Sequence, residues 1–334
     1  MAELVDARDS KSRDGNIMRV RFSLPAFFQM KNKILVIVGP TAVGKSALAV
    51  RLAKKLNGEI ISADSRQVYK WLNIGTGKIT KKEMRSVPHH LLDVVDPKKR
   101  FSAADFVRLG KKVIADIWAR GKIPIICGGT GFYIDALLGK VLFPNVPPNT
   151  ALRKKLAGKT APELFAILKK WNPAWAKKIE NNSSERHNPR HLIRAIEIAK
   201  SLPVDTGCPQ VATWELNSQV VKIGLTLPPE KLKEKIRLRL LARIRAGMIA
   251  EAKKLHRQGL SWKRMEELGL EYRYLARYLR NEISKKEMIE KLATEIWRYA
   301  KRQMTWFKQD KKINWFRPSQ SLKFILKFLG NKKD

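Results

Sequence analysis

The chain has 334 residues, which is enough for one large domain and a smaller one around a substantial apolar core. Its 68 lysine and arginine residues outnumber the 30 acidic ones, which gives a formal charge of +38. Such a charge opposes compaction through self-repulsion, and a polyanionic partner, either nucleic acid or an anionic membrane surface, would offset it. The two cysteines form no C-x-x-C pair and no apolar stretch has the length of a membrane span, so we expect no zinc site, disulfide framework or membrane helix, and a cytoplasmic location.

The chain begins with thirty polar residues of mixed character, which we interpret as a disordered leader or as a start site assigned too early. The patterns that follow predict strands at residues 33–40, 59–62 and 122–133 and helices at 45–58 and 101–121. Strands alternating with helices predict an α/β fold with a parallel sheet and crossover helices.

The pattern changes after three prolines, Pro144, Pro147 and Pro148, which mark a boundary. Helices alone are predicted from about residue 150 to 209, a strand returns at 220–228, and the remainder is helical and strongly basic. We therefore divide the chain into a leader (1–30), the first part of the core (31–147), a helical insertion (148–219), a core continuation with basic C-terminal helices (220–320) and a tail (321–334).

The stretch GPTAVGKS fits the phosphate-loop pattern G-x-x-x-x-G-K-[ST], with a predicted strand before it and a predicted helix after it. Its members are candidates for a diphosphate or ATP site: Gly39, Pro40, Thr41, Ala42, Val43, Gly44, Lys45 and Ser46. Backbone N–H groups would face the phosphate, Lys45 would supply a positive charge, and the Ser46 hydroxyl suits magnesium. The alternative is a glycine turn without a ligand, and the motif by itself does not separate kinases, GTPases, helicases and transferases.

Two polar residues follow the next two predicted strands. Asp64 comes directly after EIIS and an alanine, and Thr130 follows the glycine pair of ICGG. Because carboxyl ends of parallel strands line the crevice where ligands bind, both residues are expected there. Asp64 could cap its turn, hold magnesium or act as a base, and Thr130 could cap the next helix or offer its hydroxyl to a ligand. The residues after Asp64, namely Ser65, Arg66 and Gln67, are typical of a surface that binds a partner.

Over residues 33–316 the chain resembles the bacterial tRNA dimethylallyltransferases. The stretches that carry the resemblance, in family order, are GPTAVGKS, ISADSRQVYKWLNIGTGK, PHHLLDVVDP, FSAADF, GGTGFY, NPRHLIRAIEI, LGLEYR and AKRQMTWF. The resemblance implies a core of the P-loop NTPase type with a helical insertion that binds tRNA. It also implies transfer of a dimethylallyl group from dimethylallyl diphosphate to N6 of the adenosine on the 3′ side of the anticodon. Mg²⁺ would be the cofactor and the anticodon loop of tRNA the partner, and we expect a monomer without membrane contact.

The resemblance assigns a role to each candidate residue. Asp64 would accept the amine proton, and Thr130 would lie near the scissile carbon–oxygen bond. Lys45, Arg239 and magnesium on Ser46 would hold the leaving diphosphate. The positions implied to bind tRNA are Asp64, Ser65, Arg66, Gln67, Thr130, Arg153, Arg190, His191, Arg194, Gly269, Tyr272, Arg273, Arg298, Lys301 and Arg302. Because one residue seldom serves as both base and cap, the base role argues against a capping role for Asp64.

Three histidines and one cysteine are considered next to these candidate residues. His191 stands where an arginine is usual in the family, which would weaken one phosphate contact. His89 and His90 are expected to be structural because no carboxylate or metal partner is spaced with them. Cys127 is expected to be a small buried apolar residue, since a catalytic thiol needs a base that the sequence does not show.

Two rival functions stay open at this point: a small-molecule or nucleotide kinase with a lid insertion, and an RNA-binding NTPase switch. The basic C-terminal helices argue against the kinase, which has no need of them. The alternative is that these helices only present a solvated amphipathic face. The acid and the threonine at the crevice argue against the switch, which only has to sense a nucleotide.

Overall fold

The computed structural model describes residues 32–141, 143–144, 146–181, 183–201, 219–320 and 322–331. The predicted leader lies outside these residues, as does the end of the predicted helical insertion before residue 219. None of the described helices is long and apolar enough to cross a membrane.

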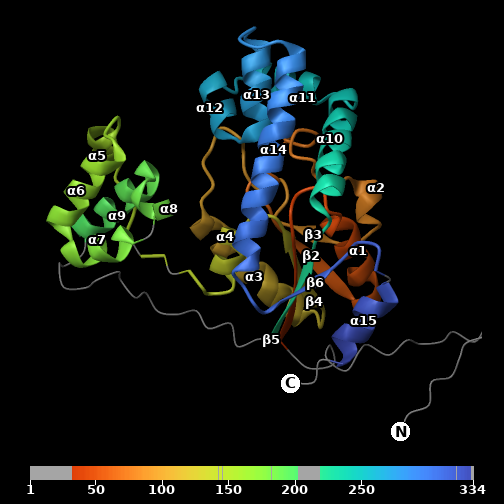
Figure 1. Ribbon diagram of the computed structural model, residues 1–334. Coiled ribbons are helices and arrows are strands. Elements are labelled where there is room, and N and C mark those ends of the chain that lie inside the picture. Colours follow the sequence, from red (N-terminus) through yellow and green to blue (C-terminus); the bar gives the residue numbers. More distant parts are fainter. Residues whose placement is uncertain are drawn as a thin grey trace, which may run out of the picture.

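The described residues contain a six-stranded, all-parallel sheet (Figure 1). Its strands are β1 (Lys33–Val38), β2 (Gly58–Ala63), β3 (His89–His90), β4 (Ile123–Gly128), β5 (Gln219–Leu225) and β6 (Ile313–Phe316), in the order β3-β2-β4-β1-β5-β6. The predicted α/β class is confirmed. Strands β3 and β6 were not predicted, because two or four residues are too few to show a pattern.

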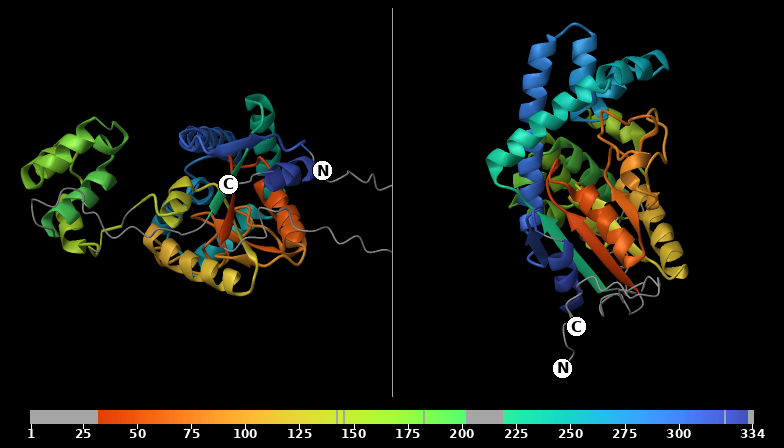
Figure 2. Two further views of the ribbon diagram at one scale, coloured as in Figure 1. Left: turned by 90° about the horizontal axis from the view of Figure 1, so that it is seen from below. Right: turned by 90° about the vertical axis from the view of Figure 1, so that its right-hand side faces the viewer.

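Strand β1 is buried on both faces, as expected for a central parallel strand. Its residues alternate between two cores: Leu35 and Ile37 face one, and Ile34, Val36 and Val38 face the other. The helices that follow the first strands are α1 (Lys45–Leu56), the short α2 (Lys81–Met84), α3 (Ala103–Ala119) and α4 (Gly131–Leu137). Helix α1 contributes to the first core, whereas α3 and α4 contribute to the second (Figure 2). In the sheet, β1 lies between β4 and β5, and the phosphate loop follows its carboxyl end. Ligands bind at the carboxyl ends of strands in open parallel sheets.

The C-terminal part adds a helical layer to the first core. Its helices are α10 (Pro229–Arg245), α11 (Met248–Arg257), α12 (Trp262–Glu267), α13 (Leu270–Leu279), α14 (Lys285–Lys308) and α15 (Leu322–Asn331). Helix α15 lies in the segment expected to be a tail, and its Ile325 and Leu329 are buried in the core. The structure thus corrects that expectation: apolar residues at helical spacing attach this segment to the body.

A separate set of helices lies beside the sheet (Figure 1). It consists of α5 (Thr150–Leu156), α6 (Ala161–Trp171), α7 (Pro173–Glu180), α8 (Ser183–Arg186) and α9 (Pro189–Ser201). Leu164, Leu168, Leu192 and Ile196 are fully buried in a core that this set builds from its own residues. Such a core supports our proposal that the segment is an inserted helical unit.

Candidate active site

The phosphate loop adopts a backbone path that its glycines permit. Gly39, Ala42 and Gly44 have positive φ angles of 141°, 63° and 107°. A Cβ atom at Gly39 would lie 2.4 Å from the carbonyl oxygen of Leu225 on β5, so only glycine fits there. Gly44 is the N-cap of α1 and provides no side-chain cap, which leaves the N-terminal N–H groups of that helix available to an anion.

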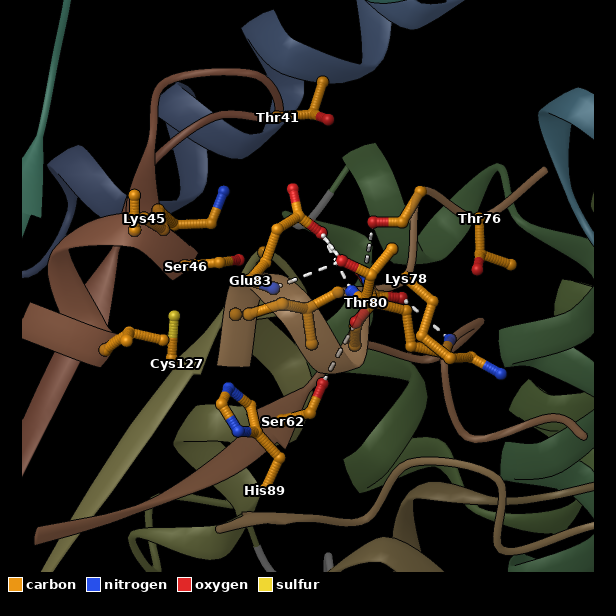
Figure 3. Close-up of a pocket in the computed structure, with 18 of the residues that line it drawn as sticks. Thr41, Lys45, Ser46, Ser62, Thr76, Lys78, Thr80, Glu83, His89 and Cys127 are labelled. Atoms are coloured by element: carbon orange, nitrogen blue, oxygen red, sulfur yellow. Dashed lines mark hydrogen bonds between the residues drawn. The ribbon is translucent and has the colours of Figure 1, made fainter. Parts of the chain in front are cut away.

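Lys45 points into a cavity of about 630 Å³ lined by the phosphate loop, the ends of β2 and β4, and α10. Its Nζ donates to the carbonyl oxygen of Pro40 at 2.7 Å. Burial lowers the pKa of Lys45 to about 8, and Arg239 adds to this effect. Figure 3 shows Thr41, Lys45 and Ser46 on the loop side of the cavity, facing Thr80 and Glu83 of the α2 region. A buried lysine beside unfilled helix N–H groups is suited to bind a diphosphate.

The two carboxylate oxygens of Asp64 differ in their hydrogen bonds. Oδ1 accepts the backbone N–H groups of Arg66 and Gln67, at 2.8 and 3.3 Å, and so caps its own turn. No hydrogen bond to Oδ2 is found in the part of the chain that the structure describes, and the residue lines the cavity. The expectation that Asp64 would not cap its turn was therefore wrong. Because a carboxylate has two oxygens, this cap leaves Oδ2 for the proposed role as base.

Thr130 is tied to the residue that follows Asp64. Its Oγ1 accepts the backbone N–H of Ser65 at 3.1 Å. Although Thr130 occupies the N-cap position of α4, its side chain makes no capping hydrogen bond there. This geometry excludes the plain capping alternative for Thr130 and brings the acid and the threonine together, as strand topology predicts.

Tyr299 of α14, directly before the AKRQMTWF stretch that carries the resemblance, completes this side of the site. Burial, and then the charge of Asp64, raise the pKa of Tyr299 to about 12, while a hydrogen bond with Thr130 partly offsets them. The tyrosine is therefore a neutral hydroxyl beside the acid and the threonine.

Arg239 joins the phosphate loop to the loop after β2. Its Nη2 donates to the carbonyl oxygen of Gly77 at 3.0 Å, and its Nη1 lies 3.5 Å from Thr41 Oγ1. The resemblance predicted this arginine at the diphosphate, and the structure brings it to the cavity that contains Lys45.

These features agree with the comparison with known proteins. Residues 67–310 match the family model described as IPP transferase. The chain belongs to this family. A relative from Treponema denticola, named tRNA dimethylallyltransferase 2, is 44% identical over 291 residues, which are 85% of this chain and 96% of the relative.

Two solved structures resemble this family member over most of its length. The full-length tRNA isopentenylpyrophosphate transferase from Bacillus halodurans is 36% identical with a TM-score of 0.67, covering 90% of this chain and 95% of that one. A eukaryotic dimethylallyltransferase acting on tRNA is 28% identical with a TM-score of 0.71, covering 86% and 74%. The predicted resemblance is confirmed over nearly the whole patterned chain.

Apart from Asp64 and Thr130, the residues of this IPP transferase family member that are expected to bind tRNA fall into three groups. The exposed ones are Arg190 and His191 on α9 and Arg298, Lys301 and Arg302 on α14. A second group is partly exposed: Gln67, which lines the cavity, and Ser65, Arg66 and Arg273. The third group makes structural contacts within the protein and consists of Arg153, Arg194, Gly269 and Tyr272.

Tyr272 is 2% exposed and donates its hydroxyl to Glu251 Oε1 at 2.6 Å. The same carboxylate accepts the backbone N–H groups of Asn73, Ile74 and Gly75, so Glu251 anchors the loop after β2. The expectation of a tRNA contact at Tyr272 is corrected by this burial, which leaves its ring no surface for RNA. Sequence reasoning missed Glu251, because its backbone partners lie about 180 residues away in the chain.

Arg153 and Arg194 both bind Glu197, whose side chain is fully buried in the helical unit. Arg153 contacts both carboxylate oxygens at 2.6 and 2.8 Å, and Arg194 also donates to the Val146 carbonyl oxygen. Burial alone would raise the pKa of Glu197, but these arginines and the Asn149 N–H lower it on balance. These arginines therefore hold the unit together, and only their partly exposed faces are free for a partner.

Gly269 has φ 129°, and a Cβ there would lie 3.0 Å from Arg66 Nε. This glycine therefore makes room for Arg66 at the edge of the site. Gly269 thus contributes through its backbone conformation and its lack of a side chain. Both are compatible with the predicted position of Gly269 next to bound tRNA.

His89 and Cys127 line the cavity, and both histidines have polar contacts (Figure 3). His89 contacts the carbonyl oxygen of Val87 through Nδ1 at 2.8 Å, and His90 Nε2 lies 2.7 Å from Glu59 Oε2. His90 thus has a carboxylate partner that the sequence spacing did not reveal. Cys127 is buried, which raises the pKa of its thiol to about 11 and keeps it protonated.

Proposed function

We propose that this protein transfers a dimethylallyl group from dimethylallyl diphosphate to N6 of the adenosine on the 3′ side of the anticodon in tRNA. The observation that carries the proposal is that Lys45 of the phosphate loop and Asp64 line one cavity, and that Oδ2 of Asp64 has no hydrogen bond among the described residues. The names of the relatives, which refer to tRNA and to prenyl transfer, point in the same direction.

The reaction exchanges one bond for another at the allylic carbon. The N6 lone pair forms the new carbon–nitrogen bond, and the carbon–oxygen bond breaks with its electron pair going to the diphosphate. The amine proton passes to the free Oδ2 of Asp64, which raises the electron density on a poor nucleophile as the bond forms. Lys45 and the loop N–H groups stabilise the negative charge that develops on the leaving group.

Magnesium would be held by the Ser46 hydroxyl and by diphosphate oxygens. Ser46 lines the cavity, and no hydrogen bond occupies its hydroxyl in the described part of the chain. Among the described residues no cluster of three or more His, Cys, Asp or Glu could hold a metal by itself, which fits an ion carried mainly by substrate phosphates and water. When bound, the ion would neutralise charge on the diphosphate.

The tRNA partner is supported by charge and by exposed side chains. The formal charge is +38, and exposed arginines and lysines lie on α9 and on α14, whose Tyr299 interacts with Asp64 and Thr130. A base must leave its stack to reach such a cavity, and proteins that bind unstacked bases use arginine and aromatic side chains. We propose that the protein does this as a monomer in the cytoplasm.

One assay tests the function against both rivals. The protein is incubated with unmodified tRNA, Mg²⁺ and either labelled dimethylallyl diphosphate or ATP labelled in the γ-phosphate. We expect label to pass from the isoprenoid to the adenosine. Transfer of phosphate to a small acceptor would instead indicate a kinase, and nucleotide hydrolysis without any transfer to tRNA would indicate a switch.

A further inference from the structure

One amide side chain lies buried between the two halves of the site. Gln303 of α14 is 5% exposed. Its Oε1 accepts the backbone N–H of Thr41 in the phosphate loop at 2.8 Å, and its Nε2 donates to the carbonyl oxygen of Gly129 at 2.8 Å. The loop and the end of β4 are thus joined through a residue that lies 262 positions from one and 174 from the other.

The link continues to the acid. Gly129 precedes Thr130, and Thr130 accepts the N–H of Ser65, next to Asp64. Thr130 in turn donates its own backbone N–H to the Ala63 carbonyl oxygen at 3.2 Å. Hydrogen bonds and two peptide links therefore connect the phosphate loop to Asp64.

We propose that Gln303 is a positioning residue that sets the separation between the phosphate loop and the Asp64–Thr130 pair. The inference rests on the proposed function, because that separation determines how the allylic carbon meets the amine. Without Gln303 the phosphate loop can still bind diphosphate and the Asp64–Thr130 pair can still bind the adenine. The allylic carbon and the N6 nitrogen would then no longer be held at a fixed separation. Misplacement of reacting groups by about 1 Å can cost about 100-fold in rate.

Gly129 and Gln303 fit one another closely. A Cβ atom at Gly129 would lie 2.2 Å from Gln303 Nε2, whereas the next atom outside this side chain, Lys45 Nζ, would be 3.8 Å away. Gly129 has no positive φ angle, so its backbone would accept alanine. The glycine is therefore required by the amide of Gln303, and removing that amide should remove the requirement.

The first experiment measures transfer under single-turnover and steady-state conditions with unmodified tRNA, Mg²⁺ and labelled dimethylallyl diphosphate. Variants are Gln303→Ala, Gln303→Glu, which has the same size but cannot donate to Gly129, and Gln303→Met, which keeps the volume and makes neither bond. The control is Thr294→Ala, an exposed residue of the same helix whose hydroxyl donates to the Glu290 carbonyl oxygen. We expect kcat to fall about 10- to 100-fold in all three Gln303 variants and to stay unchanged in the control.

A binding measurement separates positioning from loss of the loop. Calorimetric affinity for inorganic diphosphate with Mg²⁺ should stay within about threefold of wild type in the Gln303 variants, because the loop keeps its own N–H groups and Lys45. Equal losses of diphosphate affinity and rate would show that Gln303 merely holds the loop in shape. Failure of Gln303→Met to fold would likewise assign the residue to stability and overturn the proposal.

The second experiment combines Gly129→Ala with Gln303→Ala. Gly129→Ala alone should lower kcat about 10-fold or more, whereas in the Gln303→Ala background the same change should cost less than about threefold. Multiplicative losses in the double variant would contradict the proposed pairing. If the wild-type protein transfers no dimethylallyl group, the proposed function fails; if it does and Gln303→Ala matches it, only the positioning role fails.

Discussion

Ser65 donates its backbone N–H to Thr130 Oγ1 across 3.1 Å, which fixes the turn after β2 against the end of β4. Because Asp64 directly precedes Ser65, we expect this contact to help position the Asp64 carboxylate. The threonine hydroxyl therefore acts on the acid through its neighbour, and this relationship can be tested by changing the hydroxyl alone.

We expect Thr130→Val to lower kcat by about 10-fold or more, since it leaves the Ser65 N–H without its acceptor and costs about 1 kcal/mol of stability. Thr130→Ser keeps the oxygen and should stay within about threefold of wild type. Single-turnover transfer to tRNA and the thermal unfolding midpoint measure the two effects. Equal rates for the valine and serine variants would show that the hydroxyl has no positioning role.

The two oxygens of Asp64 can be separated by substitution. Asp64→Asn keeps an oxygen that can accept the Arg66 and Gln67 N–H groups, but its amide cannot take the amine proton. We expect this variant to lose about 100- to 10,000-fold in kcat while its unfolding midpoint and its affinity for diphosphate change little. Asp64→Ala should show the same kinetic loss and also unfold more easily, by about 1 kcal/mol, because the cap is gone. Near-normal turnover of Asp64→Asn would remove Asp64 from the role of base.

Much of the site could be predicted because it depends on local pattern and strand topology. The phosphate loop is continuous in the chain, and Asp64 and Thr130 meet because parallel strands end at one edge of the sheet. Gln303 and Glu251 could not be predicted in the same way. Each contacts backbone groups more than 170 residues away, and no local pattern encodes which distant N–H or carbonyl group a side chain will meet.

Acid stability should depend on Glu59, whose side chain is 1% exposed and contacts Arg120, Lys122 and His90. Burial alone would raise the pKa of Glu59, but hydrogen bonds from these residues lower it from 4.5 to about 2. Because the folded-state pKa lies below the unfolded one, the stabilisation is present above pH 4.5 and is lost as the pH falls towards 2.

We therefore expect Glu59→Gln to lower the urea midpoint at pH 7 and to flatten its dependence on pH between 2 and 5. The matched control is Asp116→Asn, which removes only the exposed partner of Arg120, and exposed pairs contribute little. Identical pH profiles for wild type and Glu59→Gln would show that the ionisation of Glu59 does not contribute to the pH dependence of stability.

His191 offers a test of the tRNA surface on α9, where it lies exposed beside Arg190. An arginine in its place would add a fixed positive charge that can contact a phosphate. We expect His191→Arg to lower the KM for tRNA a few-fold at low salt and to steepen the slope of log affinity against log salt by roughly 0.7. Lys54→Gln on α1, an exposed charge in another part of the molecule, should leave the slope unchanged (Figure 1). A slope unaltered by His191→Arg would place the backbone of the tRNA away from this face of α9, because each new phosphate contact must release counterions.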